Sequence, residues 1–160
     1  MKKFLVMLVC MCAFATASYA QQGQGMAGIN LLYGNDTNIG LGVKYRYGLT
    51  DNLRIEPHFN YFFKHDYFSM WDLGANFHYV FPVAETVGIY PLAGLAYSNG
   101  KAHGSDFGGE DVSDGKISIN LGCGADFQMA SNITLSIEAK YQIIDNVNQL
   151  VVAAGVAFAF

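Results

Sequence analysis

Strict alternation between two kinds of side chain, from Ile39 to Gly48, constrains the fold more than any other feature of the sequence. The odd positions are all apolar or aromatic, and the even positions hold glycine or a full charge. A period of two predicts a β-strand with two unlike faces. Glycine mixed with charge suits neither a dry core nor a solvated surface. We therefore interpret the apolar face as facing lipid and the other face as lining a narrow, polar barrel interior.

The same alternation recurs in seven further segments: 26–34, 53–63, 71–81, 87–98, 116–128, 133–143 and 150–160. Together the eight segments predict an all-β fold, an eight-stranded antiparallel up-and-down transmembrane β-barrel. Pro57 and Pro91 cannot donate a ladder hydrogen bond, so each predicts a bulge or a missing bond.

The predicted connections differ in length. The segments 49–52, 82–86 and 129–132 predict short turns, 64–70 predicts a loop, and 99–115 predicts a long mobile loop. Short turns at one end and longer loops at the other are typical of outer-membrane barrels.

The first twenty residues have the composition of an export signal. Lys2 and Lys3 precede an apolar run, 4–15, and small residues follow up to Ala20, which predicts a cleaved secretory signal peptide over 1–20 and a barrel domain over 21–160. The apolar run is too short to span a bilayer as a helix, and no later stretch reaches the roughly 18 apolar residues required. A membrane protein with this sequence must therefore be a closed barrel.

Charge and cysteine content narrow the function classes. Removing the leader leaves 7 Lys and Arg against 13 Asp and Glu, and this net negative charge argues against a nucleic-acid partner. It also leaves Cys123 as the sole cysteine, which excludes an intramolecular disulfide. Cys10 and Cys12 raise the alternative of a lipoprotein, but Val9 and Met11 precede them where lipid attachment favours a small residue.

All nine charged side chains of the eight segments fall on the face interpreted as inward. In up-and-down order the third and seventh strands stand opposite each other, which predicts Arg54 and Glu56 facing Glu138 and Lys140. Each ion removed from water needs a partner, so we expect a paired network. The candidate lumen charge network is Lys44, Arg46, Arg54, Glu56, Asp72, Asp126, Glu138 and Lys140, and the ninth charge is Lys116.

Alternation alone also fits a soluble, lipocalin-like barrel with its two faces reversed. Glycine on the charged face, unequal connections and two groups of outward aromatic residues near the strand ends favour a membrane barrel. The predicted aromatic belts contain Tyr33, Tyr45, Tyr47, Tyr61, Phe63, Trp71, Tyr79, Phe81, Tyr97, Phe127, Tyr141 and Phe158.

The leader, the eight segments, the stretch 90–95 and the final Phe160 resemble the small OmpA/OmpX-like outer-membrane β-barrels of the porin-like superfamily. The resemblance implies export through the periplasm to the Gram-negative outer membrane and contact with its lipid and lipopolysaccharide. It also implies that the barrel assembly machinery reads the last strand, where Val156, Phe158 and Phe160 match the family pattern.

These features predict a structural or interaction role at the cell envelope, with a closed lumen and with loops available to an external protein or surface ligand. The alternatives are a narrow gated pore, a lipid-modifying barrel enzyme and a secreted lipocalin-like carrier. His58 and His78 point inward, and His65 and His103 lie in predicted loops. Because no Ser-His-carboxylate spacing stands out, we predict no enzyme, no catalytic residue and no cofactor.

The long predicted loop is acidic. Its four carboxylates could hold calcium loosely, but they lack the ligand spacing of a known calcium loop, so we predict no metal site there. They are Asp106, Glu110, Asp111 and Asp114.

Overall fold

The computed structural model describes residues 23–65, 68–102, 112–145 and 147–160. The predicted signal peptide, Cys10, Cys12 and most of the acidic loop lie outside these ranges. Within them no helix is long and apolar enough to cross a membrane. The strands are β1 (Gly25–Gly34), β2 (Asn38–Gly48), β3 (Leu53–His65), β4 (Phe68–Tyr79), β5 (Phe81–Ala84), β6 (Val87–Ala102), β7 (Val112–Ala130), β8 (Ile133–Ile144) and β9 (Val147–Ala159).

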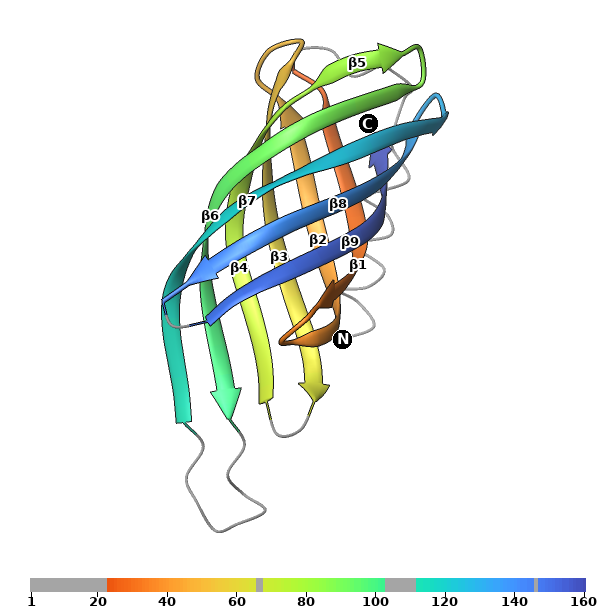
Figure 1. The fold of residues 1–160 in the computed structure, drawn as a ribbon. Helices are drawn as coiled ribbons and strands as arrows, with labels where there is room; N and C mark the ends of the chain where they lie inside the picture. Colours follow the sequence, from red (N-terminus) through yellow and green to blue (C-terminus); the bar gives the residue numbers. More distant parts are fainter. Residues whose placement is uncertain (1–22, 66–67, 103–111, 146) are drawn as a thin grey trace.

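The strands form one closed antiparallel barrel (Figure 1). Consecutive strands pair with each other except β4 and β5, β9 returns to β1, and the pairing of β4 with β6 completes the ring. The wall therefore has eight strands, because β5 continues the line of β4. The eight-stranded all-β barrel predicted from the alternation is confirmed.

The interruption between β4 and β5 lies opposite Pro91. Pairing of β4 with β6 stops at His78 and Leu92 and resumes in the same register between β5 and β6, at Phe81 and Ile89. Proline has no N–H to give to the ladder. The backbone N–H of Val80 instead donates to the Asn52 carbonyl in the β2–β3 turn, at 2.7 Å. The missing bond predicted at Pro91 is confirmed.

Pro57 interrupts a second ladder. Between β2 and β3, pairing runs from Gly40 to Lys44 and resumes at Tyr47 without a register shift. Tyr45 and Arg46 of β2 therefore have no ladder partner in β3, where Pro57 and Glu56 would lie opposite them. Pro57 still pairs with Ala75 of β4. This is the missing bond predicted from the sequence, without the bulge that was its alternative.

Three connections are shorter than predicted. The expected turn 82–86 forms most of β5, so only Glu85 and Thr86 turn the chain. Both ends of the expected loop 99–115 belong to β6 and β7, because these strands stay paired as far as Ala102 and Val112. The expected loop 64–70 is likewise shortened by β3 and β4. Backbone pairing needs no side-chain alternation, so a hydrophobicity pattern does not reveal these extensions.

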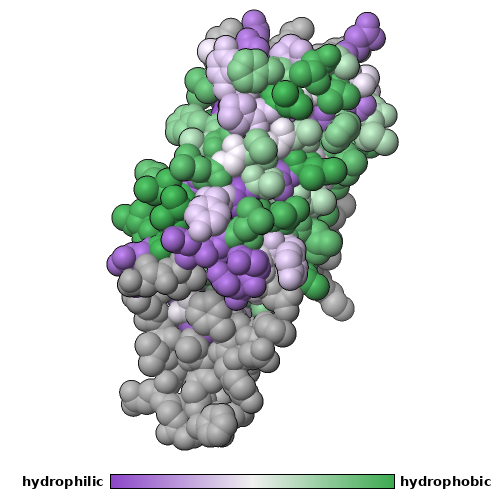
Figure 2. Space-filling model, in the orientation of Figure 1, coloured by the Kyte–Doolittle hydropathy of each residue, from purple (hydrophilic) through white to green (hydrophobic). Residues whose placement is uncertain are grey.

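The two faces of the wall differ as the alternation predicts. On β2, Leu41 is 52 % exposed on the outside, whereas Arg46 is 1 % exposed on the inside. Figure 2 shows apolar side chains covering much of one outer face, with the most hydrophilic residues gathered toward its ends.

Candidate functional site

The lumen near the short-turn end holds six charged side chains, here called the charged layer. Three are basic and three acidic, and the layer draws on β2, β3, β7 and β8. Its members are Lys44, Arg46, Arg54, Glu56, Asp126 and Glu138. Because each charge pairs inside the layer, the lumen is electrically balanced at this depth.

Arg46 is the centre of the charged layer. Its Nε donates to Glu56 of β3 at 2.5 Å, its Nη1 to Asp126 of β7 at 3.1 Å, and its Nη2 to Glu138 of β8 at 2.6 Å. One guanidinium on β2 thus joins three other strands across the interior. Charge-assisted bonds of this kind are roughly twice as strong as neutral ones.

The other two cations complete the charged layer. Lys44 Nζ lies 3.2 Å from Glu138 and 3.7 Å from Glu56, and it also donates to the Ser136 hydroxyl at 2.9 Å. Arg54 Nη1 donates to Asp126 at 2.5 Å. No carboxylate of the layer is left without a basic partner.

Tyr90 belongs to the same layer but was missed from the sequence. Its hydroxyl donates to Glu138 at 2.8 Å, its ring stacks on His78 at 4.6 Å between centroids, and the Arg54 guanidinium carbon lies 4.4 Å from its ring centroid. The signal was available, because Tyr90 is in phase with Gly88 and Gly94 of the inner face. Gly124 makes room for it, since a Cβ there would lie 2.5 Å from the Tyr90 ring.

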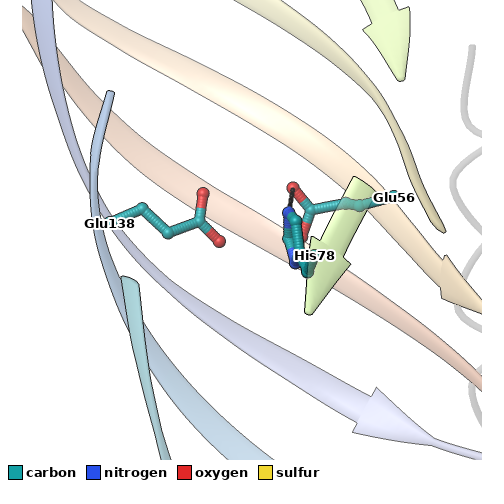
Figure 3. Close-up of side chains that lie close together, drawn as sticks. All are labelled: Glu56, His78 and Glu138. Carbon is teal, nitrogen blue, oxygen red and sulfur yellow. Dashed lines mark ion pairs between the residues drawn. The ribbon is translucent and has the colours of Figure 1, made fainter. Parts of the chain in front are cut away.

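Glu56, His78 and Glu138 bring three potential metal-ligand atoms within 4.8 Å of one another (Figure 3). Arg54 Nε donates to His78 Nδ1 at 3.0 Å, so the remaining ring proton sits on Nε2, which is therefore not free to bind a metal. Both carboxylates already bind Arg46 and Lys44. A further cation would meet three positive side chains here, so the donor set does not fit a metal.

A second group, here called the polar layer, lies on the loop side of the charged layer. Its centre is Asp72, which is 0 % exposed and accepts from Asn60 at 2.8 Å, with His58 Nε2 at 3.4 Å. Lys140 is close enough to interact with Asp72 electrostatically. Amides and hydroxyls extend the layer through Gln142, Ser98, Ser118, Gln149 and Thr37.

Apolar side chains fill the remaining lumen toward the loop end. They form one buried cluster: Leu32, Phe62, Met70, Ile144, Val151 and Ala153. Phe62 and Val151 are fully buried. On β1, β3, β4 and β8 these apolar side chains lie nearer the loops than the polar ones, whereas on β9 Gln149 lies nearer the loops than Val151 and Ala153.

The prediction for the opposed strands is correct for Glu56 and Glu138, whose carboxylates lie within 4.8 Å of each other, and wrong for Arg54. Arg54 pairs with Asp126 rather than facing Glu138, and Lys140 interacts electrostatically with Asp72 of the polar layer. Strands in a closed barrel are tilted and staggered, so equal positions on opposite strands do not lie at equal heights. Lys116, also expected inside, reaches the rim, where it donates to the Asp145 carbonyl at 3.3 Å.

The residues of the predicted aromatic belts lie outside the barrel. Most are 38–55 % exposed, whereas Trp71 and Phe127 are half-buried among neighbouring side chains. Of the predicted assembly signal, Phe158 and Phe160 are exposed and Val156 is half-buried, and the Phe160 ring lies 5.9 Å from that of Tyr45. These positions suit contact with lipid at the two rims.

Three comparisons place this architecture among known proteins. The family model described as outer membrane protein beta-barrel domain matches residues 4–160. A comparison with curated proteins gives no match. Solved structures with similar folds include the N-terminal β-barrel domain of Pseudomonas aeruginosa OprF, with 21 % identity, a TM-score of 0.70, and coverage of 87 % of this chain and 100 % of that one.

Two further solved structures have the same fold. Neisserial surface protein A has 18 % identity and a TM-score of 0.68, with 86 % of this chain and 96 % of that chain covered. Ail of Yersinia pestis, solved with the heparin analogue sucrose octasulfate, has 21 % identity and a TM-score of 0.66, with 88 % and 100 % covered.

Proposed function

Because the chain belongs to the outer membrane protein beta-barrel domain family, and so to the Gram-negative outer membrane, we propose that it is a structural and interaction protein whose closed barrel carries its loops outside the cell. The observation that carries this proposal is Arg46, fully buried and bound to carboxylates from three strands. Such a brace rigidifies the wall and fills the lumen. The buried apolar cluster fills a further part of the interior.

Conductance in planar lipid bilayers tests the closed lumen. We expect wild-type protein to give no single-channel steps, and Lys101→Met, a change at an exposed position on the β6 extension, to give none either. A stable conductance from wild-type protein would overturn the proposal.

A narrow gated pore is the second candidate, and one observation favours it. Two small cavities, about 150 and 70 Å³, open at the short-turn end, and both are lined by Arg54. The Arg54 Nη2 is buried and has no hydrogen-bond partner in the protein. Recordings from a Glu138→Ala variant test this candidate, because loss of that carboxylate frees Arg46, Lys44 and Tyr90. Silence from both wild type and variant would remove it.

The proposed contacts with an external protein or surface ligand involve the β6–β7 hairpin. The two strands pair with each other out to Val112, whereas β7 pairs with β8 only as far as Ser118, so the hairpin projects beyond β8 (Figure 1). Sucrose octasulfate, the ligand in the Ail structure, is polyanionic. The segment 101–114 of this chain carries four carboxylates, so it fits an external protein or a cationic surface ligand better. Deleting 101–114 should reduce cell adhesion while leaving barrel folding intact.

The proposal also holds that the barrel is not an enzyme. His58 and His78 are engaged with lumen groups, through Asp72, Asn76 and Arg54. Such buried rings have no route to a lipid substrate on the outer face. Lipase and palmitoyl-transfer assays on purified protein should give no activity above that of a His65→Ala variant.

A further inference from the structure

Two prolines each leave the barrel wall without one ladder bond, and we call these two positions the proline gaps. Pro57 pairs with β4 but not with β2, so its missing N–H is the one that would reach the Tyr45 carbonyl. Pro91 pairs with β7 but not with β4, which leaves the Tyr79 carbonyl in the same position. A backbone group without a partner is costly inside a membrane, because hydrocarbon offers no hydrogen bond.

The outer face does not reinforce the proline gaps. Tyr45 and Pro57 line one hollow of about 410 Å³, and Tyr90 and Pro91 line another of about 630 Å³. The lining of both hollows is almost wholly apolar, so it supplies no substitute for the missing bonds. At each gap the wall can therefore be reinforced only from the lumen.

On the inner face, one side-chain contact crosses each gap, and we call these two the gap contacts. The register places Arg46 of β2 directly opposite Glu56 of β3, and Arg46 Nε donates to Glu56 at 2.5 Å. At the second gap the His78 ring of β4 stacks on the Tyr90 ring of β6, with 4.6 Å between their centroids. Each contact thus joins the two strands whose backbone bond is missing.

The two gap contacts belong to one connected group. Arg46 Nη2 donates to the Tyr90 hydroxyl at 3.1 Å, and His78 Nε2 lies 3.8 Å from Glu56 (Figure 3). All four side chains are buried, so water does not compete for either contact. The charged layer therefore lies at the height of both proline gaps.

We propose that the charged layer holds the barrel wall closed at the two proline gaps, and that the wall opens sideways at these gaps when the layer is broken. All four residues of the gap contacts are direct neighbours in the chain of the residues that lack the bond. A strand pair that has lost both its backbone bond and its gap contact separates more easily than a fully bonded pair. A conducting barrel would have the same gaps and contacts, so this proposal and the closed lumen fail separately.

Crossed double-mutant cycles test the coupling. Pro57→Val and Pro91→Val each restore one backbone N–H at an exposed outer position, whereas Glu56→Leu and His78→Leu each remove one gap contact. Urea titrations in micelles give the folding equilibrium constant, and a heat-dependent gel shift verifies that each variant is folded. The loss caused by Glu56→Leu should be about tenfold smaller in Pro57→Val than in wild type, and should change by no more than about threefold in Pro91→Val. His78→Leu should show the reverse preference.

Amide hydrogen exchange locates the opening. In Glu56→Leu, the amides of Tyr45 and Tyr47, next to the first gap, should lose protection at least about tenfold more than those of β8 and β9. Gln142→Leu is the matched control, because Gln142 is buried in the same lumen but pairs in β7–β9, at neither gap. It should not produce this local loss at Tyr45 and Tyr47.

Three results would overturn the proposal. The first is additivity of the proline and contact variants, which would mean that the layer and the gaps act independently. The second is equal coupling of Glu56→Leu to both prolines, which would identify a general electrostatic effect. The third is a uniform loss of protection over all strands, which would mean that the barrel unfolds as a whole. If Glu56→Leu does not fold, Glu56→Gln takes its place, because the amide weakens the contact with Arg46 and still fills the site.

Discussion

The charged layer and the polar layer fill the same lumen by different means. In the charged layer, long ionised side chains reach across the barrel, and Arg46 alone binds three carboxylates. In the polar layer, a single buried carboxylate, Asp72, is surrounded by amides, a histidine and hydroxyls. Gln142 donates to Asp72 and accepts from Gln149. A charge that loses its partner stays costly, whereas a neutral group that loses one bond costs less. The two layers should therefore respond differently to truncation.

The largest effect should come from Arg46→Met. Removing the guanidinium leaves Glu56, Asp126 and Glu138 buried with too little positive charge, and breaking such a pair costs about 3–5 kcal/mol. Urea unfolding in micelles, followed by the fluorescence of Trp71, the sole tryptophan, measures the loss. Equal losses for Arg46→Met and for a polar-layer variant would remove the distinction between the layers.

Gly124→Ala sharpens the comparison by disturbing the charged layer without removing a charge. The added methyl would lie 2.5 Å from the Tyr90 ring and displace it from Glu138 and His78. Overpacking of this kind costs about 2 kcal/mol. Gly88→Ala is the control, because its nearest contact is a Val80 methyl at 3.1 Å and its neighbourhood is open. Similar unfolding free energies for the two variants would show that Tyr90 is not held in place by packing.

Gln142→Leu tests the polar layer. Asp72 keeps Asn60 and His58 and loses only its long, 3.5 Å bond from Gln142, so the loss falls mainly on neutral hydrogen bonds and should be about 1 kcal/mol in the same urea titration. A loss as large as that of Arg46→Met would show that the amides brace the barrel as strongly as the ion pairs do.

The smallest effect should come from Lys101→Met on the projecting hairpin. This position is exposed, so the change in unfolding free energy should stay within about 0.5 kcal/mol. A larger change would show that the hairpin contributes to barrel stability, and the adhesion test on the 101–114 deletion would then need a stability control.

The sequence predicts the wall better than it predicts what fills it. Alternation assigns Lys44 and Arg46 to the interior, and the prolines mark the two ladder interruptions. The height of a side chain along the barrel axis depends on strand tilt and stagger. Neither of these produces a local pattern in the sequence, so the pairing of Arg54 with Asp126 could not be predicted. Tyr90 was missed although it is in phase with Gly88 and Gly94, because the candidate network was drawn from charged residues alone. The ends of β6 and β7 were missed because their glycines and carboxylates do not alternate with apolar residues, although their backbones are paired.

The partners of Arg46 also constrain how the barrel can enter the membrane. Strands β2 and β3 form a local hairpin that carries Lys44, Arg46 and Arg54 with only one of the three carboxylates of the charged layer, Glu56. The other two arrive with β7 and β8, late in the chain. A half-built sheet would expose unneutralised cations to hydrocarbon, which is costly. We therefore expect insertion and closure to be coupled, with β2 and β3 meeting β7 and β8 before the sheet crosses the bilayer.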